Sequence, residues 1–194
     1  MAEIGIDIDK AKSFLDRGQL IGLPTETVYG LAGNAFNESA VLKIFQVKNR
    51  PSFDPLIAHT NSLEKVAAPS ANPFGYVSPT TAHHVQDQLG ESIPYILDGG
   101  PCRVGIESTI IGFENNKPVV YRLGGKRIDE IEKLIGTVRI RTNMSSDPTA
   151  PGMLKSHYAP VKRVVIGDLE ELIPKLNPLK VAVISFQKDY PEVP

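Results

Sequence analysis

The stretch QLIGLPTETVYGL, residues 19–31, is the part of the sequence that decides the fold. Residues 19–23 form a short apolar run that stops at Pro24, and such a run predicts a buried strand. The polar segment Thr25-Glu26-Thr27 follows at once. Loops just past strand ends are where α/β proteins place ligands, so Thr27 is a candidate binding residue. The same segment equally fits an ordinary turn or the start of a helix.

Apolar patterns on both sides of this stretch predict alternating helices and strands. We expect helices at residues 8–17, 38–49, 78–89 and 128–135. Asn37 is the predicted N-cap of the second helix, and Ser78, followed by Pro79, is that of the third. Further strands are expected at residues 56–59, 95–97, 107–113, 118–123 and 137–141. The alternation predicts one α/β domain over residues 1–141, built on a largely mixed sheet.

Residues 142–160 interrupt this rhythm. They hold three prolines and a glycine and show little apolar periodicity, which is typical of a linker or a lid. His157 and Tyr158 in this segment have side chains that can hydrogen-bond to or stack on a nucleotide. A strand at residues 163–166, a helix at 169–176 and a strand at 180–186 are expected next. This βαβ opening requires more strands beside it, so residues 161–194 form a partial second unit.

Composition excludes several classes of protein. The 194 residues carry 21 Lys or Arg and 22 Asp or Glu, so there is no global basic field for nucleic acid. The lone cysteine, Cys102, cannot form an internal disulfide and favours a reducing compartment. No apolar run approaches the roughly 18 residues of a membrane span, and no secretory signal is visible. We expect a cytoplasmic protein without a membrane segment.

Two short polar motifs are candidates for ligand binding. Lys48 and Arg50 lie where a helix ends, just before Pro51, and could clamp a phosphate. The alternative is that the two cations only complement the helix dipole. Ser70 and Asn72 lie between prolines in a segment that forms either a plain turn or a rigid polar loop.

Motifs of other enzyme classes are missing. There is no GxSxG elbow, no GxxxxGK[ST] loop, no GxGxxG fingerprint and no metal-ligand spacing. Residues 117–141 hold seven Lys or Arg against three Asp or Glu. They could form a basic rim for phosphates or RNA, or simply a solvated surface.

Five segments, taken in order, resemble the YrdC-like domain of threonylcarbamoyl-adenylate synthases. They are LPTETVYGL (23–31), KIFQVKNRP with PLIAH behind it (43–59), APSANPFGYVSPT (68–80), LDGG (97–100) and VGIESTI (104–110). Residues 150–160, APGMLKSHYAP, resemble the linker of the longer form of the family, which carries a small Rossmann-like C-terminal domain. The resemblance implies an α/β fold, a twisted mixed sheet flanked by helices with a concave ligand face.

The resemblance also implies an activity, that of an L-threonylcarbamoyladenylate synthase, a nucleotidyltransferase. Bicarbonate and L-threonine give a carbamate, which attacks the α-phosphate of ATP and releases pyrophosphate. The product serves the N6-threonylcarbamoyladenosine modification of tRNA. Mg²⁺ would accompany ATP, with no organic cofactor and no metal site of the protein itself. Contact with tRNA or a downstream transferase is a further expectation.

Roles follow for residues that match the family's motifs. Lys48 and Arg50 are the expected catalytic residues. The expected L-threonine ligands are Thr27, His59, Ser70 and Ser108, although a lone strand-end histidine is more often structural. The expected ATP ligands are Lys48, Arg50, Asn72, Ser78, Thr80, Arg122 and Ala150. His157 and Tyr158 would belong to the lid.

The sequence departs from the family in three places. Asp54 stands where the family usually has asparagine, and Arg122-Leu123-Gly124 replaces the usual Arg-Pro-Gly. A long segment that contains a tryptophan is missing near residues 66–67, and this chain has no tryptophan at all. Two alternatives therefore stand beside the enzyme: a non-catalytic RNA-binding relative and an inactive, deleted fragment.

Overall fold

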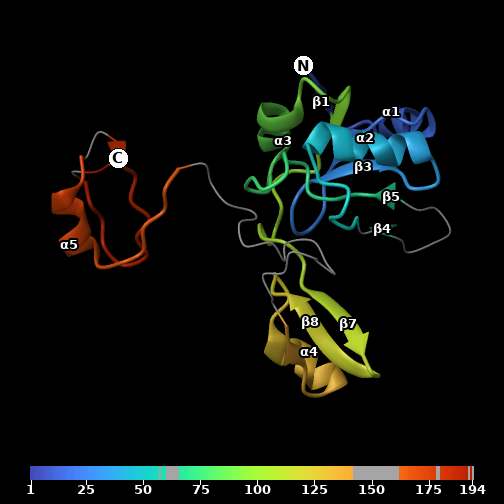
Figure 1. The fold of residues 1–194 in the computed structure, drawn as a ribbon. Helices are drawn as coiled ribbons and strands as arrows, with labels where there is room; N and C mark the ends of the chain where they lie inside the picture. The colour runs from blue at the N-terminus through green and yellow to red at the C-terminus, as the bar shows by residue number, and fades with distance from the viewer. Residues whose placement is uncertain (57, 60–65, 142–161, 178–179, 192, 194) are drawn as a thin grey trace. The chain divides into compact units, whose positions relative to one another are not determined.

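The buried strand predicted at residues 19–23 is β2 (Ile21–Leu23), which lies within a six-stranded mixed sheet (Figure 1). The computed structural model describes residues 1–56, 58–59, 66–141, 162–177, 180–191 and 193. The chain divides into two units, Met1–Ala159 and Pro160–Pro194.

Strand order in the large sheet is β1-β6-β2-β3-β5-β4. The partners of β2 are β1 (Glu3–Gly5), β3 (Gly30–Asn34), β4 (Ala58–His59), β5 (Val66–Ala67) and β6 (Tyr95–Leu97). Strands β1 and β2 both run parallel to β6, and the other pairs are antiparallel. The register of β2 on β3 sets Leu23 opposite Gly30, so the loop 24–29 joins two neighbouring strands.

Helices cover both faces of this sheet, because side chains alternate along each strand. On one face, Ile21 and Tyr95 pack with Ala11 of α1 (Ile8–Asp16). On the other face, Leu31 and Ile96 share a buried cluster with α2 (Glu38–Lys48) and α3 (Ala82–Leu89). The sheet therefore forms the middle of three layers.

Local capping confirms the predicted ends of α2. The Asn37 side chain accepts from the backbone N–H of Ala40 at 3.2 Å. Asn49 adopts a left-handed conformation with φ 50° at the C-cap, and Pro51 follows two residues later. Asparagine tolerates this conformation better than most residues, so the helix ends where the chain must turn.

The predicted start of the third helix was wrong. Thr81, not Ser78, is the N-cap of α3, because its hydroxyl accepts from the backbone N–H of His84 at 3.2 Å. The Ser78 hydroxyl instead donates to the carboxylate of Glu107. Residues 78–80 are thereby kept out of the helix.

A second, three-stranded sheet completes the first unit. The hairpin of β7 (Ile110–Glu114) and β8 (Lys117–Arg122) turns through Asn115 and Asn116, both at positive φ. Strand β9 (Arg139–Ile140) runs parallel to β8. Helix α4 (Ile128–Ile135) covers this sheet through Ile131, which packs with Val120 and Val138.

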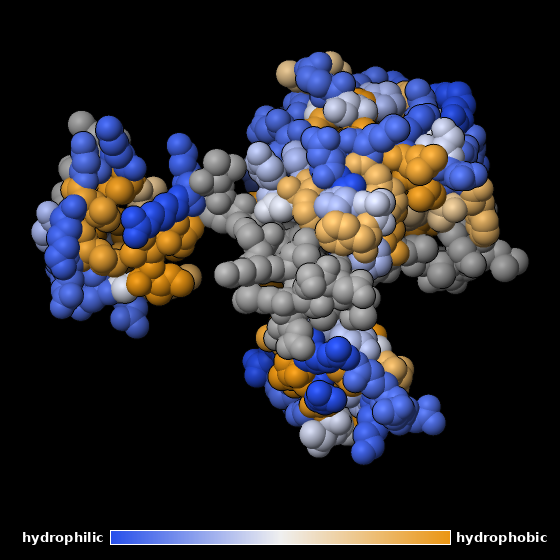
Figure 2. Space-filling view, viewed as in Figure 1, coloured by the Kyte–Doolittle hydropathy of each residue, from blue (hydrophilic) through white to orange (hydrophobic). Residues whose placement is uncertain are grey.

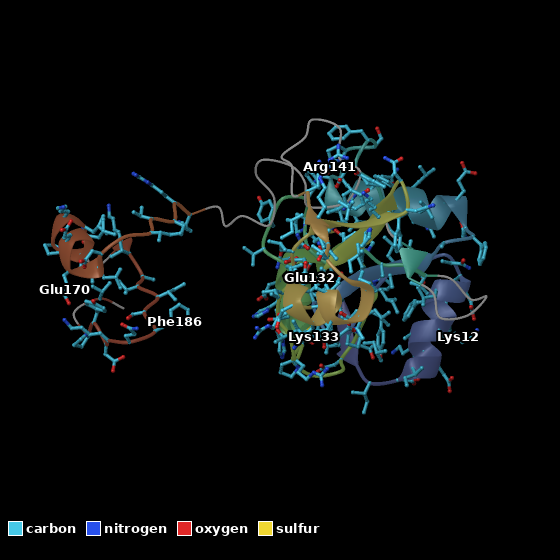
Figure 3. The ribbon with its side chains drawn as sticks, turned by 90° about the horizontal axis from the view of Figure 1, so that it is seen from below. Lys12, Glu132, Lys133, Arg141, Glu170 and Phe186 are labelled. Carbon is cyan, nitrogen blue, oxygen red and sulfur yellow. The ribbon has the colours of Figure 1, made fainter. Side chains whose placement is uncertain are left out.

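The second unit has a helix but lacks the expected strands. Helix α5 (Leu169–Leu172) continues as a 3₁₀ turn (Ile173–Lys175). Within the part of this unit that the structure describes, no strand forms at residues 163–166 or 180–186. Most of their apolar side chains stay exposed, in keeping with the orange surface that Figure 2 shows for this unit, and Phe186 (Figure 3) is 98% exposed. Without neighbours to pair with, such short segments have no ladder to join.

Across the described residues, no helix has both the length and the apolar character needed to cross a bilayer. The predicted linker, residues 142–160, lies outside the described residues.

Candidate functional site

The loop between β2 and β3 draws together the motifs singled out in the sequence. The backbone N–H of Tyr29 donates to the carbonyl of Pro79 at 2.8 Å, and that of Ala71 donates to the Tyr29 carbonyl at 2.8 Å. The N–H of Gly105 donates to the carbonyl of Thr27 at 3.0 Å. Three segments far apart in sequence therefore lie against residues 27–29.

The side chain of Tyr29 ties a fourth motif to this loop. Its hydroxyl donates to the carbonyl of Gly100 at 2.8 Å and accepts from the N–H of Gly99 at 3.2 Å. The Asp98 carboxylate lies 3.2 Å from the same hydroxyl. Burial raises the pKa of Tyr29, so the phenol stays protonated and serves as a fixed strut.

Lys48 joins α2 to the Ser70-Ala71-Asn72 segment. Its side chain is 1% exposed, and its ammonium donates to the carbonyl oxygens of Ser70 and Asn72. Burial, aided by the charge of Arg50, lowers the pKa of Lys48 to about 7, against the opposing pull of Asp54. Lys48 can therefore exchange its proton far more easily than a surface lysine.

Arg50 faces a buried carboxylate, that of Asp54. Its Nη2 atom lies 2.7 Å from Oδ2 of Asp54, with side chains that are 3% and 0% exposed. The guanidinium also donates to the carbonyl of Pro55 at 2.6 Å and stands 6.0 Å from the centre of the Phe74 ring. Burial raises the pKa of Asp54, although Arg50 and Lys48 counteract this.

Asn72 fixes the same loop from inside. Its side chain is 1% exposed, and Nδ2 donates to the carbonyls of Pro73 and Tyr76 at 2.9 and 2.8 Å. Among the described residues, its Oδ1 atom receives no hydrogen bond. A buried acceptor without a donor is costly in an apolar interior and is suited to a ligand that supplies the missing donor.

Ser108 and Arg122 form a second pair. The Nε atom of Arg122 donates to the Ser108 carbonyl at 3.0 Å, and Nη2 lies 3.2 Å from the Ser108 hydroxyl. Gly124 packs so tightly against this loop that a Cβ would stand 2.2 Å from the Glu107 carbonyl oxygen. The Ser78 bond to Glu107 ties the loop to residues 78–80.

Three further expected ligands, Thr27, His59 and Thr80, belong to the described residues. Thr27 Oγ1 lies 3.1 Å from Thr25 Oγ1, and Thr80 Oγ1 lies 3.2 Å from Nδ1 of His84. His59 is in β4, opposite Val66 of β5. Ala150, His157 and Tyr158 lie outside the described residues.

Sequence reasoning missed Tyr29, Asp98 and Glu107 as parts of the site. All three residues were inside quoted motifs, Tyr29 in 23–31, Asp98 in 97–100 and Glu107 in 104–110, so the motifs themselves carried the signal. The contact of Glu107 with Ser78 is visible only in the structure.

Four of the seven cations in residues 117–141 have acidic partners within the same unit. Lys126 pairs with Glu130, and Arg127 lies 2.9 Å from Asp129. Arg141, labelled in Figure 3 with Glu132 and Lys133, pairs with Glu114. These pairs favour a solvated surface over a basic rim.

Family comparisons place this geometry in a known class. The profile of the Sua5/YciO/YrdC family, described as telomere recombination, matches residues 13–68 and 63–124. The profile described as threonylcarbamoyl-AMP synthase, C-terminal domain, matches residues 127–192. The threonylcarbamoyl-AMP synthase of Pyrococcus abyssi is 34% identical over 255 residues, covering 90% of this chain and 75% of that protein. The chain belongs to the threonylcarbamoyl-AMP synthase family.

A second relative and a solved structure of the threonylcarbamoyl-AMP synthase family are also similar to this chain. The Bacillus subtilis enzyme of that name is 32% identical over 228 residues, covering 82% of this chain and 66% of that protein. A crystal structure of P. abyssi Sua5 complexed with L-threonine superposes with a TM-score of 0.80 and 31% identity, covering 92% of this chain and 75% of that one. The expected α/β fold, a mixed sheet flanked by helices, is confirmed for the first unit, and the family consists of nucleotidyltransferase-type enzymes.

The alignment with P. abyssi threonylcarbamoyl-AMP synthase is longer than this chain, 255 residues against 194. It must therefore open gaps in this chain. The two matches of the first family profile meet at residues 63–68.

Proposed function

We propose that the protein makes L-threonylcarbamoyl-AMP and pyrophosphate from ATP, L-threonine and bicarbonate. The observation that carries this proposal is the buried cluster in which Lys48 holds the Ser70-Ala71-Asn72 segment beside Arg50. Two cations and small polar groups, fixed beside the loop 24–29, suit an anionic triphosphate and a small polar amino acid. Membership of the threonylcarbamoyl-AMP synthase family supports the same reaction.

Lys48 and Arg50 take the catalytic role in this proposal. Transfer of an adenylyl group needs positioning and neutralisation of phosphate charge more than acid–base chemistry. Both cations are held by protein acceptors, so ATP must replace some of those contacts with its own oxygens. Negative charge develops on the pyrophosphate as it leaves, and Lys48 and Arg50 would stabilise that charge.

The remaining site residues are assigned to one or the other of the two larger substrates, L-threonine and ATP. Thr27, His59, Ser70 and Ser108 would hold L-threonine, a ligand present in the P. abyssi crystal structure. Asn72, Ser78, Thr80, Arg122 and Ala150 would line the ATP side of a concave face. His157 and Tyr158 would close over the nucleotide as parts of a lid, an assignment that rests on the sequence.

Mg²⁺ would enter bound to the phosphates of ATP. The described residues contain no group of three or more His, Cys, Asp or Glu side chains that could hold a metal ion. We also propose a cytoplasmic enzyme, in keeping with the single free thiol of Cys102, whose product is used on tRNA.

A missing internal segment is the main departure from the family. We propose that this chain lacks a stretch near residues 63–68 that its relatives have, because the profile matches break there. Strands β4 and β5 pair directly across this point, with Ala58 opposite Ala67. Strand β4 is the outermost strand of the large sheet, and β5 lies between it and β3.

Pyrophosphate release tests the proposal. The purified 194-residue chain should release pyrophosphate from ATP only when L-threonine and bicarbonate are both present. L-Valine, which has the same shape without the hydroxyl, serves as the control and should support little release. Pyrophosphate release that does not depend on L-threonine would contradict the proposal. So would the absence of release from a protein that is folded, as shown by a cooperative melt.

A further inference from the structure

Asp54 is fully buried, yet it belongs to a short turn beside the cations. The backbone N–H of Asp54 donates to the Pro51 carbonyl at 3.1 Å, which curls the chain back toward Arg50. The carboxylate contacts Nη2 of Arg50 at 2.7 Å, and the Asp54 carbonyl lies 3.3 Å from Nε. One turn thus wraps the guanidinium with a carboxylate and with backbone oxygens.

This carboxylate is poorly satisfied for a structural ion pair. Among the described residues, neither of its oxygens receives a hydrogen bond, although Oδ2 is close enough to Arg50 for charge attraction. Buried ion pairs stabilise a fold only when hydrogen bonds satisfy their remaining lone pairs. Burial raises the pKa of Asp54, which indicates the same strain on its charged form.

We infer that Asp54 is an internal counterion that occupies Arg50 in the empty enzyme and that the triphosphate of ATP displaces it. Asp54 is then a positioning residue that weakens ATP binding. The inference rests on the proposed function, because it takes ATP to be the ligand of Arg50.

The physical argument is a competition of two anions for one cation. A carboxylate and a phosphate both match the planar donors of a guanidinium. When only a fraction of molecules have Arg50 free, the apparent affinity for ATP falls by that fraction. The i,i+4 spacing of Asp54 and Arg50 makes the competing anion permanently available.

An isosteric amide tests the competition. Asp54→Asn removes the charge and keeps the shape, so Mg-ATP should bind about tenfold more tightly by calorimetry. The affinity for tripolyphosphate should rise by the same factor in Asp54→Asn, and the affinity for adenosine should not change. Asp54→Glu keeps the negative charge, so its affinity for Mg-ATP should stay close to that of the wild type. If Asp54→Asn lacks a cooperative melt, Asp54→Ser is measured in its place. Asp16→Asn, from the exposed i,i+4 pair with Lys12, is the matched control and should leave affinity unchanged.

The outcomes separate the inference from its rivals. Weaker Mg-ATP binding together with a raised Mg²⁺ requirement in Asp54→Asn would make Asp54 a ligand of the incoming Mg²⁺ and overturn the inference. An unchanged dissociation constant with a lowered melting temperature would reduce Asp54 to a structural role. If the wild type binds ATP in these cases, the proposed function stands, whereas no ATP binding by the folded wild type would overturn both.

Discussion

The ammonium of Lys48 donates to the backbone carbonyl of Ser70, 22 residues away in sequence. This bond joins the Lys48-Asn49-Arg50 and Ser70-Ala71-Asn72 motifs into one cluster. Each motif by itself has a bland explanation, a charged helix end in one case and a turn in the other. Burying a lysine ammonium costs free energy, which its hydrogen bonds to two backbone carbonyls offset in part. Neutralising phosphate, the role proposed above, accounts for a cation at this buried position.

Arg50→Ala should damage ATP use much more than Lys43→Ala does. Both residues belong to the same basic stretch, but Arg50 is 7% exposed beside the proposed phosphate site. Loss of a charge-assisted phosphate contact should cost about 1.5–3 kcal/mol in kcat/KM for ATP. Pyrophosphate release measures this, at a temperature where both variants are folded. Equal effects of the two substitutions would support a plain charged surface.

Lys48 should make stability depend on pH. Its pKa falls from 10.5 to about 7 on folding, so between these values the unfolded chain binds more protons than the folded one. The free energy of unfolding should therefore rise with pH from about 7 upward, by at most about 1.4 kcal/mol per unit from this group. Urea unfolding at several pH values measures the free energy of unfolding of the wild type and of Lys48→Met. As the pH rises above 7, the wild type should gain stability relative to Lys48→Met. A constant difference would mean that Lys48 keeps an ordinary pKa.

Tyr29→Phe should destabilise the site without touching a substrate. It removes the hydroxyl that donates to Gly100 and accepts from Gly99, leaving two backbone groups without that partner. The expected loss is about 1–3 kcal/mol in the free energy of unfolding. Tyr76, 47% exposed, provides the control, since Tyr76→Phe should change stability by less than about 0.5 kcal/mol. Denaturant unfolding measures the free energy of unfolding of both variants. Similar losses of this free energy in Tyr29→Phe and Tyr76→Phe would contradict the role of Tyr29 as a strut.

Gly124→Ala should disrupt the loop that carries Ser108. A Cβ at this position would lie 2.2 Å from the Glu107 carbonyl oxygen and 2.4 Å from the Ser108 carbonyl carbon, so the backbone must move. A displaced ligand loop should lower kcat/KM for L-threonine by about 10- to 100-fold. Leu123→Ala, at a neighbouring residue that is 54% exposed, should leave activity near the wild type. A Gly124→Ala enzyme with unchanged threonine kinetics would remove Ser108 from the site.

Local signals explain what the sequence could predict of the fold. Asn37 at the start of α2 and Gly136 after α4 are caps that work within one turn of a helix, so they can be recognised from neighbours alone. Strand β3 could not be predicted in this way. Its sequence GLAGN has low strand propensity, and it is a strand because β2 and β5 flank it.

Side-chain contacts that only the folded chain creates explain what the sequence could not predict of the site. The motifs singled out Lys48, Ser70 and Asn72, and the structure brings these three residues together. That Asp54 faces Arg50, and that Ser78 reaches Glu107 instead of capping α3, depends on the path of the folded chain. No periodicity or motif encodes these two pairs.

Formation of the adenylate tests the central claim most directly. The protein is incubated with ATP, L-threonine and ¹³C-bicarbonate, and the nucleotide products are separated and weighed by mass spectrometry. We predict threonylcarbamoyl-AMP that carries one ¹³C atom, absent when threonine is omitted and strongly reduced in Arg50→Ala. A folded protein that binds ATP and L-threonine but yields no labelled adenylate would contradict the account.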